Sequence, residues 1–406
     1  MSSQPSVNIG MVGHVDHGKS TLTHALTGIK TDTHSEEIKR GISIKLGYAD
    51  TTIYKCPDGN GGISYRRIME SDQCSESRTV SFVDAPGHET LMATMLSGSS
   101  IMNGAILVIA ANEKCPQPQT REHLIALEIM GKTEIIVVQN KIDLVTKERA
   151  IENYNEIRAF LKGSVAENAP VIPASAYHNI NIDAIFKAIE ENIKTPAFDP
   201  SVDPMMYIAR SFDVNRPGTK PKNLKGGVLG GSLVRGELKI GDEIEISPGI
   251  QITKENKNVW ENVITEVTSL MAGKNSYDRI RPGGLAAVGT TLDPFLTKND
   301  SMTGRVIGKV GKVPPMIFNA TIEIHLLRRV VGSAEETAVS PLRSKESLML
   351  TVGTANTVGL VTTARSDSIE ITLKYPVCAT PGDRVAIGRR IADRWRLIGY
   401  GTIDSA

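Results

Sequence analysis

The chain has 406 residues, which is too long for one ordinary hydrophobic core and suits two to four domains. Hydrophobic residues make up 40% and charged residues 22% of the sequence, as is usual for a folded soluble protein. The formal net charge of +1 creates no long-range field that would attract nucleic acid, so local basic patches would have to hold any such partner.

The sequence shows no sign of export or membrane insertion. No segment approaches the ~18 uninterrupted apolar residues of a membrane span, and the N-terminus has no basic region followed by an apolar stretch. The four cysteines, Cys56, Cys74, Cys115 and Cys378, lie far apart, which does not indicate a disulfide framework and fits a reducing compartment. We therefore expect a cytoplasmic globular protein.

Short apolar runs alternate with helical spacing in the first half of the chain. The runs are Val7–Gly13, Val80–Val83, Ala105–Ala111, Ile135–Val138 and Val171–Pro173. The helical segments are Lys19–Leu26, His88–Met102, Gln119–Met130, Glu148–Leu161 and Ile182–Ile193. This α/β pattern predicts a mostly parallel sheet with helices on both faces. Because prolines in Thr195–Pro204 indicate a linker, we place this first domain at residues 1–200.

Glycine-punctuated, alternating runs fill the second half and favour antiparallel strands curled into barrels. The first group is Gly231–Arg235, Glu237–Ile240, Glu243–Ser247 and Leu285–Val288. After a Pro-containing joint at Lys312–Pro315 come Thr321–Leu327, Leu348–Val352, Ser368–Leu373 and Trp395–Ile398. We expect two β-barrel domains, at residues 201–313 and 314–406.

The segment GHVDHGKS, residues 13 to 20, matches a phosphate-binding loop between a strand and a helix. Its glycines let successive backbone N–H groups point at phosphates, and the helix that follows adds its partial positive end. We expect Lys19 to reach the β- and γ-phosphates and the Ser20 hydroxyl to bind Mg²⁺. Asp16 is a second candidate for the metal. The nucleotide ligands predicted from this loop are Asp16, His17, Gly18, Lys19, Ser20 and Thr21.

The segment NKID, residues 140 to 143, follows the run Ile135–Val138. A carboxylate at Asp143 can accept two parallel hydrogen bonds from guanine, and adenine would leave it unpaired, which discriminates strongly between the bases. We expect Asn140 to contact the N7 side of the purine and Lys141 to cover one ring face. Backbone N–H groups of Ser175, Ala176 and Tyr177 would bind the guanine oxygen.

The segment DAPGHE, residues 84 to 89, ends the strand at Val80–Val83 and is typical of a γ-phosphate sensor. Asp84 would hold Mg²⁺ through water and Gly87 would give its N–H to the γ-phosphate. His88 would orient the attacking water as the catalytic residue; a plain surface histidine is the alternative. A second switch segment spans residues 36 to 49, in which the Ser43 hydroxyl and the Gly41 carbonyl would approach the metal.

Taken together, GHVDHGKST, RGISIKLGYA, DAPGHE, CPQPQT, NKID and SAY resemble the gamma subunit of the eukaryotic and archaeal initiation factor two. RSFDVNRPGT, RPGGLAAVGT and GRRIADRWRLIGYGTI extend the resemblance over nearly the whole chain. It implies a GTPase that carries initiator methionyl-tRNA to the small ribosomal subunit and works with alpha and beta subunits. It also implies activating and exchange partners. Tyr48, in LGYA, is the candidate for a tRNA-end contact by stacking; a packed strand-start tyrosine is an equal alternative.

Two departures from the family pattern have consequences. Serine stands at position 43, where threonine is common, which keeps the hydroxyl but loses a methyl group that restrains the rotamer. Archaeal relatives often carry a four-cysteine zinc knuckle at residues 55 to 78, where this chain keeps only Cys56 and Cys74. A structural zinc site requires four ligands, so we predict no zinc. The loss also favours a eukaryotic or reduced-genome source.

Three functions remain open from the sequence. The first is a tRNA-delivery GTPase that hydrolyses GTP slowly until a partner completes the site, since no arginine finger is evident. The second is a GTP-gated assembly hub that hydrolyses almost nothing. The third is a carrier of another aminoacyl-tRNA.

Overall fold

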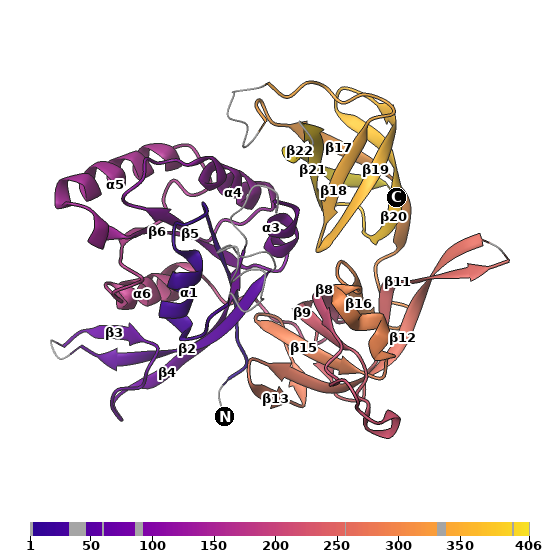
Figure 1. Ribbon diagram of the computed structural model, residues 1–406, viewed down its shortest axis with the longest axis horizontal. Coiled ribbons are helices and arrows are strands. Elements are labelled where there is room, and N and C mark those ends of the chain that lie inside the picture. Colours follow the sequence, from indigo (N-terminus) through magenta and orange to yellow (C-terminus); the bar gives the residue numbers. More distant parts are fainter. Residues whose placement is uncertain are drawn as a thin grey trace. The chain divides into compact units, whose positions relative to one another are not determined.

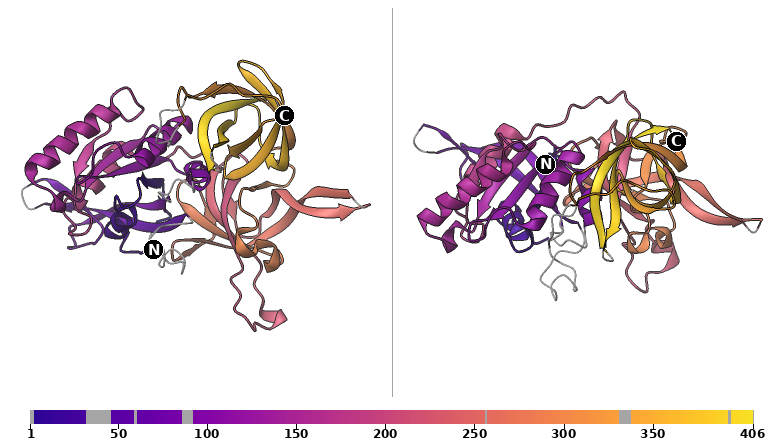
Figure 2. Two further views of the ribbon diagram at one scale, coloured as in Figure 1. Left: turned by 45° about the horizontal axis from the view of Figure 1, so that its top comes forward. Right: turned by 90° about the horizontal axis from the view of Figure 1, so that it is seen from above.

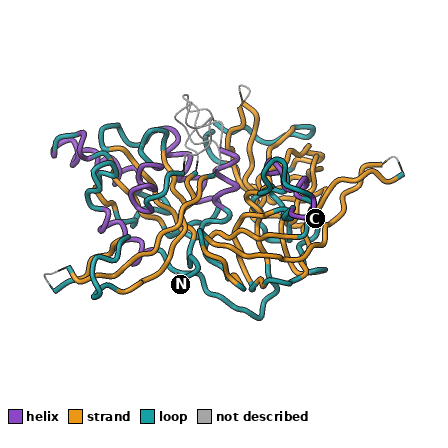
Figure 3. The backbone as a smooth tube through the Cα atoms, turned by 60° about the horizontal axis from the view of Figure 1, so that its bottom comes forward, coloured by secondary structure: helices purple, strands orange, loops and turns teal. Residues whose placement is uncertain are grey.

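The fold was analysed in a computed structural model, which describes residues 3–31, 46–58, 61–85, 92–255, 257–330, 338–391 and 394–405. The chain divides into two compact units. The first runs up to Pro196, and the second runs from Ala197 to Arg329 and from Ala338 onward. Figure 3 shows the long helices in the first unit, whereas the second consists mainly of strands and loops with short helical turns.

A seven-stranded sheet forms the centre of the first unit, in the order β3-β2-β4-β1-β5-β6-β7 (Figure 1). Its strands are β1 (Asn8–Gly13), β2 (Gly47–Pro57), β3 (Ile63–Arg66), β4 (Ser75–Asp84), β5 (Gly104–Ala110), β6 (Ile135–Asn140) and β7 (Val171–Pro173). The five strands from β4 to β7 in this order are parallel. The strands β2 and β3 join antiparallel at one edge.

Helices cover both faces of this sheet. They are α1 (Lys19–Thr27), α3 (Met92–Ser99), α4 (Pro118–Ile129), α5 (Lys147–Leu161) and α6 (Ile182–Asn192); the short η2 (Ile142–Leu144) follows β6 and has no buried residue. Ile106 and Val108 of β5 share a buried core with α1 and α6. The alternate residues Ala105, Leu107 and Ile109 are equally buried but point to the opposite face, where α4 packs against β1 and β5. The predicted α/β sheet is confirmed.

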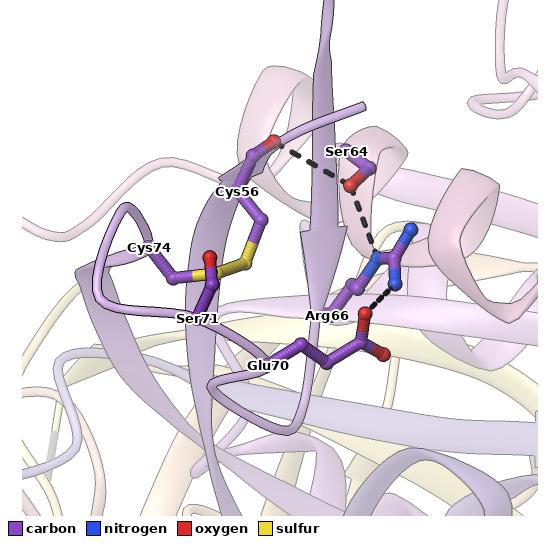
Figure 4. Close-up of a disulfide and its surroundings, with 6 residues drawn as sticks. All are labelled: Cys56, Ser64, Arg66, Glu70, Ser71 and Cys74. Atoms are coloured by element: carbon purple, nitrogen blue, oxygen red, sulfur yellow. Dashed lines mark hydrogen bonds and ion pairs between the residues drawn. A yellow bond between two sulfur atoms is a disulfide. The ribbon is translucent and has the colours of Figure 1, made fainter. Parts of the chain in front are cut away.

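The edge strands β2 and β3 are a difference from the sequence-based expectation, which placed no strand between residues 50 and 78. Here Cys56 of β2 and Cys74, just before β4, form a disulfide with an S–S distance of 2.09 Å (Figure 4). This single disulfide was not anticipated from the wide spacing of the four cysteines. The reason is antiparallel pairing: β2 returns through β3 and β4, which brings together two residues 18 positions apart.

The second unit begins with a barrel closed in the order β11-β16-β8-β9-β15-β12, with β11 and β12 also paired. Its elements are β8 (Met205–Phe212), η3 (Pro221–Asn223), β9 (Val228–Arg235), β10 (Leu238–Lys239), β11 (Glu243–Lys254), β12 (Lys257–Ala272), β13 (Asn275–Tyr277), β14 (Arg279–Ile280), β15 (Leu285–Thr290), η4 (Pro294–Asp300) and β16 (Val306–Lys309). The long strands β11 and β12 extend beyond the barrel as a hairpin, visible in Figures 1 and 2. Buried aliphatic side chains from all six barrel strands fill the interior.

A second closed barrel follows in the order β17-β20-β19-β18-β21-β22. Its strands are β17 (Met316–Leu326), β18 (Ser347–Val352), β19 (Ala355–Ala364), β20 (Ser368–Cys378), β21 (Arg384–Ile391) and β22 (Arg394–Ser405). Both antiparallel barrels were predicted, and both are confirmed. Within the described ranges, no helix is long and apolar enough to cross a membrane.

Candidate nucleotide site

The predicted phosphate loop joins the end of β1 to the start of α1. Its backbone takes left-handed or related conformations at Gly13 (φ 138°), Asp16 (φ 63°) and Gly18 (φ 90°). A Cβ atom on Gly13 would lie 2.3 Å from the backbone oxygen of Val108, so any other residue would push the loop away from β5. The glycines are therefore required by backbone conformation and by close packing.

Two side chains of this loop point in different directions. The Lys19 ammonium is largely buried and donates to the backbone oxygen of His14 at 2.9 Å. The His17 imidazole is buried beneath the loop, with Nδ1 3.1 Å from the oxygen of Val108 and Nε2 3.4 Å from the carboxylate of Glu113. Burial lowers the pKa of His17 to about 4. The side chain of His17 therefore has a structural role, and its backbone N–H donates to the backbone oxygen of His14 at 3.4 Å.

Asn140, at the end of β6, connects three predicted site elements. Its Nδ2 donates to the backbone oxygen of His17 at 2.9 Å, and its Oδ1 accepts from the N–H of Ala176 at 3.0 Å. A Cβ on Gly18 would lie 2.4 Å from the same amide. The phosphate loop, the NKID segment and the Ser-Ala-Tyr segment are thus joined through one buried side chain. Its contact with the purine stays a prediction.

The predicted base-recognition residues lie next to this amide. Lys141 has a left-handed backbone (φ 62°), and Asp143 follows in η2. The Asp143 carboxylate lies 3.7 Å from Nε2 of His178. The Tyr177 side chain is 80% exposed and its ring meets His178 edge-on. Ser175 is buried, and its hydroxyl accepts from the N–H of His178 at 3.3 Å.

A cavity of about 530 Å³ adjoins these segments, within the size range of small-molecule sites. Ser20 and Thr21 line it together with Ala176 and Tyr177, which are all predicted ligands. The basic residues His24, Lys30 and Arg67 also line it, and no Asp or Glu is among the described lining residues. Such a lining suits an anionic ligand such as a nucleotide.

Asp84 ends β4 with a fully buried carboxylate, which accepts a hydrogen bond from the Thr31 hydroxyl at 2.7 Å. Thr31 also lines the cavity beside Ser20. The carboxylate and the Ser20 hydroxyl are hard oxygen ligands of the kind that Mg²⁺ prefers. Over the described part of the chain, no group of three His, Cys, Asp or Glu side chains forms a metal cluster.

Several predicted residues lie outside the described residues: Gly41, Ser43, Gly87 and His88. Tyr48 is described; it is partly buried in β2 and pairs with Val83 of β4.

Thr31, Arg67 and His123 are among the residues of this region that sequence reasoning missed. Thr31 binds Asp84, Arg67 reaches the cavity from the end of β3, and His123 of α4 accepts a hydrogen bond from the phosphate loop. Thr31 and Arg67 belong to none of the motifs. His123 lies three residues after CPQPQT, but its contact with Gly13 depends on how α4 packs, which the motif does not show.

Comparison with known proteins identifies the family to which this chain belongs. Residues 4–195 match the family described as the elongation factor Tu GTP binding domain, and residues 318–403 match the initiation factor eIF2 gamma, C terminal. The translation initiation factor 2 subunit gamma of Thermoplasma acidophilum is 70% identical over 99% of this chain and 98% of its own length. That of Methanocaldococcus jannaschii is 59% identical over the same shares. The chain belongs to the translation initiation factor 2 gamma-subunit family.

As a member of this family, the chain is a translation GTPase. The two relatives named above come from archaea. Among solved structures, a bacterial selenocysteine-specific elongation factor has a TM-score of 0.74 at 24% identity and covers 98% of this chain and 58% of its own. The elongation factor SelB of Methanococcus maripaludis has a TM-score of 0.73 at 21% identity, with 100% and 80% covered. Both show the fold alone.

Proposed function

We propose that this protein carries initiator methionyl-tRNA to the small ribosomal subunit while GTP is bound, and releases it after GTP hydrolysis. The proposal rests chiefly on membership of the gamma-subunit family over the full length of the chain. It is supported by the Asn140 amide, which joins the phosphate loop to the base-recognition segments as one unit. The bound nucleotide is GTP or GDP with Mg²⁺.

In this proposal, guanine binds between Asp143, the stem of Lys141 and the backbone of Ser175–Tyr177, while the phosphates lie on the loop that begins at Gly13. Lys19 donates to the carbonyl of His14 at 2.9 Å, and its other N–H groups would bind the β- and γ-phosphates. These additional bonds are favourable because an ammonium binds anionic oxygens strongly.

Ser20 and Asp84 would hold Mg²⁺, Asp84 through water, with Asp16, Gly41 and Ser43 as further candidate ligands. The ion supplies positive charge that offsets the negative charge developing during phosphoryl transfer. His88 would orient the attacking water, and Gly87 would contact the γ-phosphate. Because no arginine finger is evident in the loop, we expect hydrolysis by the isolated subunit to be slow until a partner supplies one.

The register of the sheet supports a link between nucleotide and tRNA. Gly47 at the start of β2 pairs with Asp84, the proposed metal carboxylate, and Tyr48 pairs with Val83 beside it. A rearrangement around Asp84 would therefore shift the backbone at Tyr48, the proposed tRNA contact. GTP-dependent binding of tRNA requires a structural link of this kind between the nucleotide and the tRNA site.

We further propose an assembly with alpha and beta subunits, the small ribosomal subunit, and activating and exchange partners. The decisive experiment measures binding of initiator methionyl-tRNA with GTP, a non-hydrolysable analogue or GDP, with and without the alpha subunit. Elongator methionyl-tRNA is the matched competitor. We expect GTP-dependent preference for the initiator tRNA; equal affinity for both tRNAs, or equal affinity with GTP and GDP, would reject the proposal.

A variant test addresses Tyr48 separately. Tyr48→Ala should weaken initiator tRNA binding roughly tenfold, because stacking on one aromatic ring contributes ~1–3 kcal/mol. Tyr48→Phe, which keeps the ring, should bind tRNA almost as well as the natural chain. A loss of GDP affinity in the alanine variant would instead indicate a structural role of this tyrosine.

A further inference from the structure

A buried histidine that is not among the predicted site residues holds the phosphate loop by a hydrogen bond to its backbone. His123 lies in the middle of α4 and is 1% exposed. Its Nδ1 accepts a hydrogen bond from the backbone N–H of Gly13 at 2.8 Å. Gly13 is the last residue of β1, so this bond fixes the chain where the strand stops and the loop begins.

Only a neutral imidazole can make this bond. An N–H donates to Nδ1, so Nδ1 carries no proton and the ring proton must be on Nε2. Burial, and then the nearby Lys19, His14 and His17, lower the pKa of His123 to about 3. The ring is therefore a permanent acceptor near neutral pH.

The hydrogen bond between Gly13 and His123 is connected through the next residue of the loop to Lys19, which would contact the phosphates. Gly13 is followed by His14, whose backbone oxygen accepts from the Lys19 ammonium at 2.9 Å. Gly13 itself cannot shift toward β5, because there is too little space between them: a Cβ atom built on Gly13 would lie only 2.3 Å from the backbone oxygen of Val108. A fixed Gly13 thus fixes the peptide that positions Lys19.

We propose that His123 is a positioning residue for the phosphate loop, which sets the affinity for the nucleotide's β-phosphate without touching the nucleotide. The inference rests on the proposed placement of the β- and γ-phosphates at Lys19, and it does not depend on tRNA delivery. Loss of the acceptor leaves a buried N–H unpaired, so the loop gives up its receptive conformation to satisfy that group elsewhere.

The test compares three variants of the full chain. His123→Asn keeps an oxygen close to the position of Nδ1, and His123→Leu removes the acceptor. His123→Gln moves the polar group toward the position of Nε2. Leu127→Ala, a buried site of the same helix, is the control for lost packing. Dissociation constants for GDP and GMP are measured by competition with a fluorescent GDP derivative. Thermal unfolding of each nucleotide-free variant checks that it folds.

We expect His123→Leu to bind GDP roughly tenfold more weakly, and GMP, which lacks the β-phosphate, with little change. His123→Asn and Leu127→Ala should bind both nucleotides as the natural chain does. If His123→Leu fails to fold, His123→Gln takes its place with the same expectation. A GDP affinity within twofold of the natural chain would overturn the proposal, and so would an equal loss for GDP and GMP or an asparagine variant as weak as leucine.

The outcome stays separate from that of the proposed function. If initiator tRNA does not bind but the GDP series behaves as expected, tRNA delivery is rejected and the role of His123 stands. The reverse result rejects the role of His123 alone.

Discussion

Asn140→Ala is the substitution that most directly tests whether one side chain holds the phosphate loop and the base-recognition segments together. The substitution removes two hydrogen bonds, to the backbone oxygen of His17 at 2.9 Å and from the N–H of Ala176 at 3.0 Å. Both partners belong to residues that are buried. At about 1–1.5 kcal/mol for each bond, the two losses amount to about 2–3 kcal/mol. Since 1.4 kcal/mol is about a factor of ten, we expect GDP to bind roughly 30- to 150-fold more weakly.

The matched control is Asn8→Ala. Asn8 is also a buried asparagine of the central sheet, but it lies at the start of β1, where its Nδ2 donates to the backbone oxygen of Ile101 at 2.9 Å. The substitution removes this bond and should lower the free energy of unfolding by about 1–1.5 kcal/mol without changing GDP affinity. The assay is equilibrium binding and dissociation of fluorescent GDP, with urea unfolding of both variants. The reasoning is refuted if Asn140→Ala binds GDP within threefold of the natural chain, or if Asn8→Ala weakens binding equally.

Three further predictions address base choice, the disulfide and pH. Asp143→Asn should weaken GDP binding and relax selection against other purine nucleotides, measured by competition; an unchanged GDP affinity contradicts the assigned base pocket. Replacing both Cys56 and Cys74 by serine should lower the free energy of unfolding by about 3 kcal/mol, as expected for a closed loop of this length, and leave GDP binding intact; a melting temperature indifferent to both the substitutions and reductant would contradict this. His123 has a pKa of about 3 when folded and an ordinary value near 6.5 when unfolded, so acid favours the unfolded chain. Stability should fall as pH drops from about 6.5 toward 3, by up to about 1.4 kcal/mol per pH unit from this histidine, and urea titrations of His123→Asn should show a shallower slope.

Local patterns were enough to predict the order of the domains and most of their elements. Runs such as Ala105–Ala111 are apolar at every position because both faces of the strand are covered, and that periodicity is visible without a structure. The antiparallel edge strands β2 and β3 were missed although the sequence carries a hairpin signal: the glycine-rich stretch DGNGG, residues 58 to 62, lies between the end of β2 and the start of β3. The flanking residues form no continuous apolar run, and the pattern was not interpreted as strands. The same omission hid the Cys56–Cys74 disulfide, since pairing of distant cysteines depends on strand register.

By itself, the sequence determined the chemistry of the nucleotide site. GHVDHGKS and NKID need particular residue types at fixed spacing, because glycine conformations, an ammonium and a carboxylate act through local backbone geometry. Only the tertiary structure decided how these segments support one another. The Asn140 amide spans three segments, and His123 reaches Gly13 from a helix more than a hundred residues later in the chain. Such contacts arise when separate elements pack on one sheet, and packing between distant elements leaves no periodic or motif-like trace in the order of the residues.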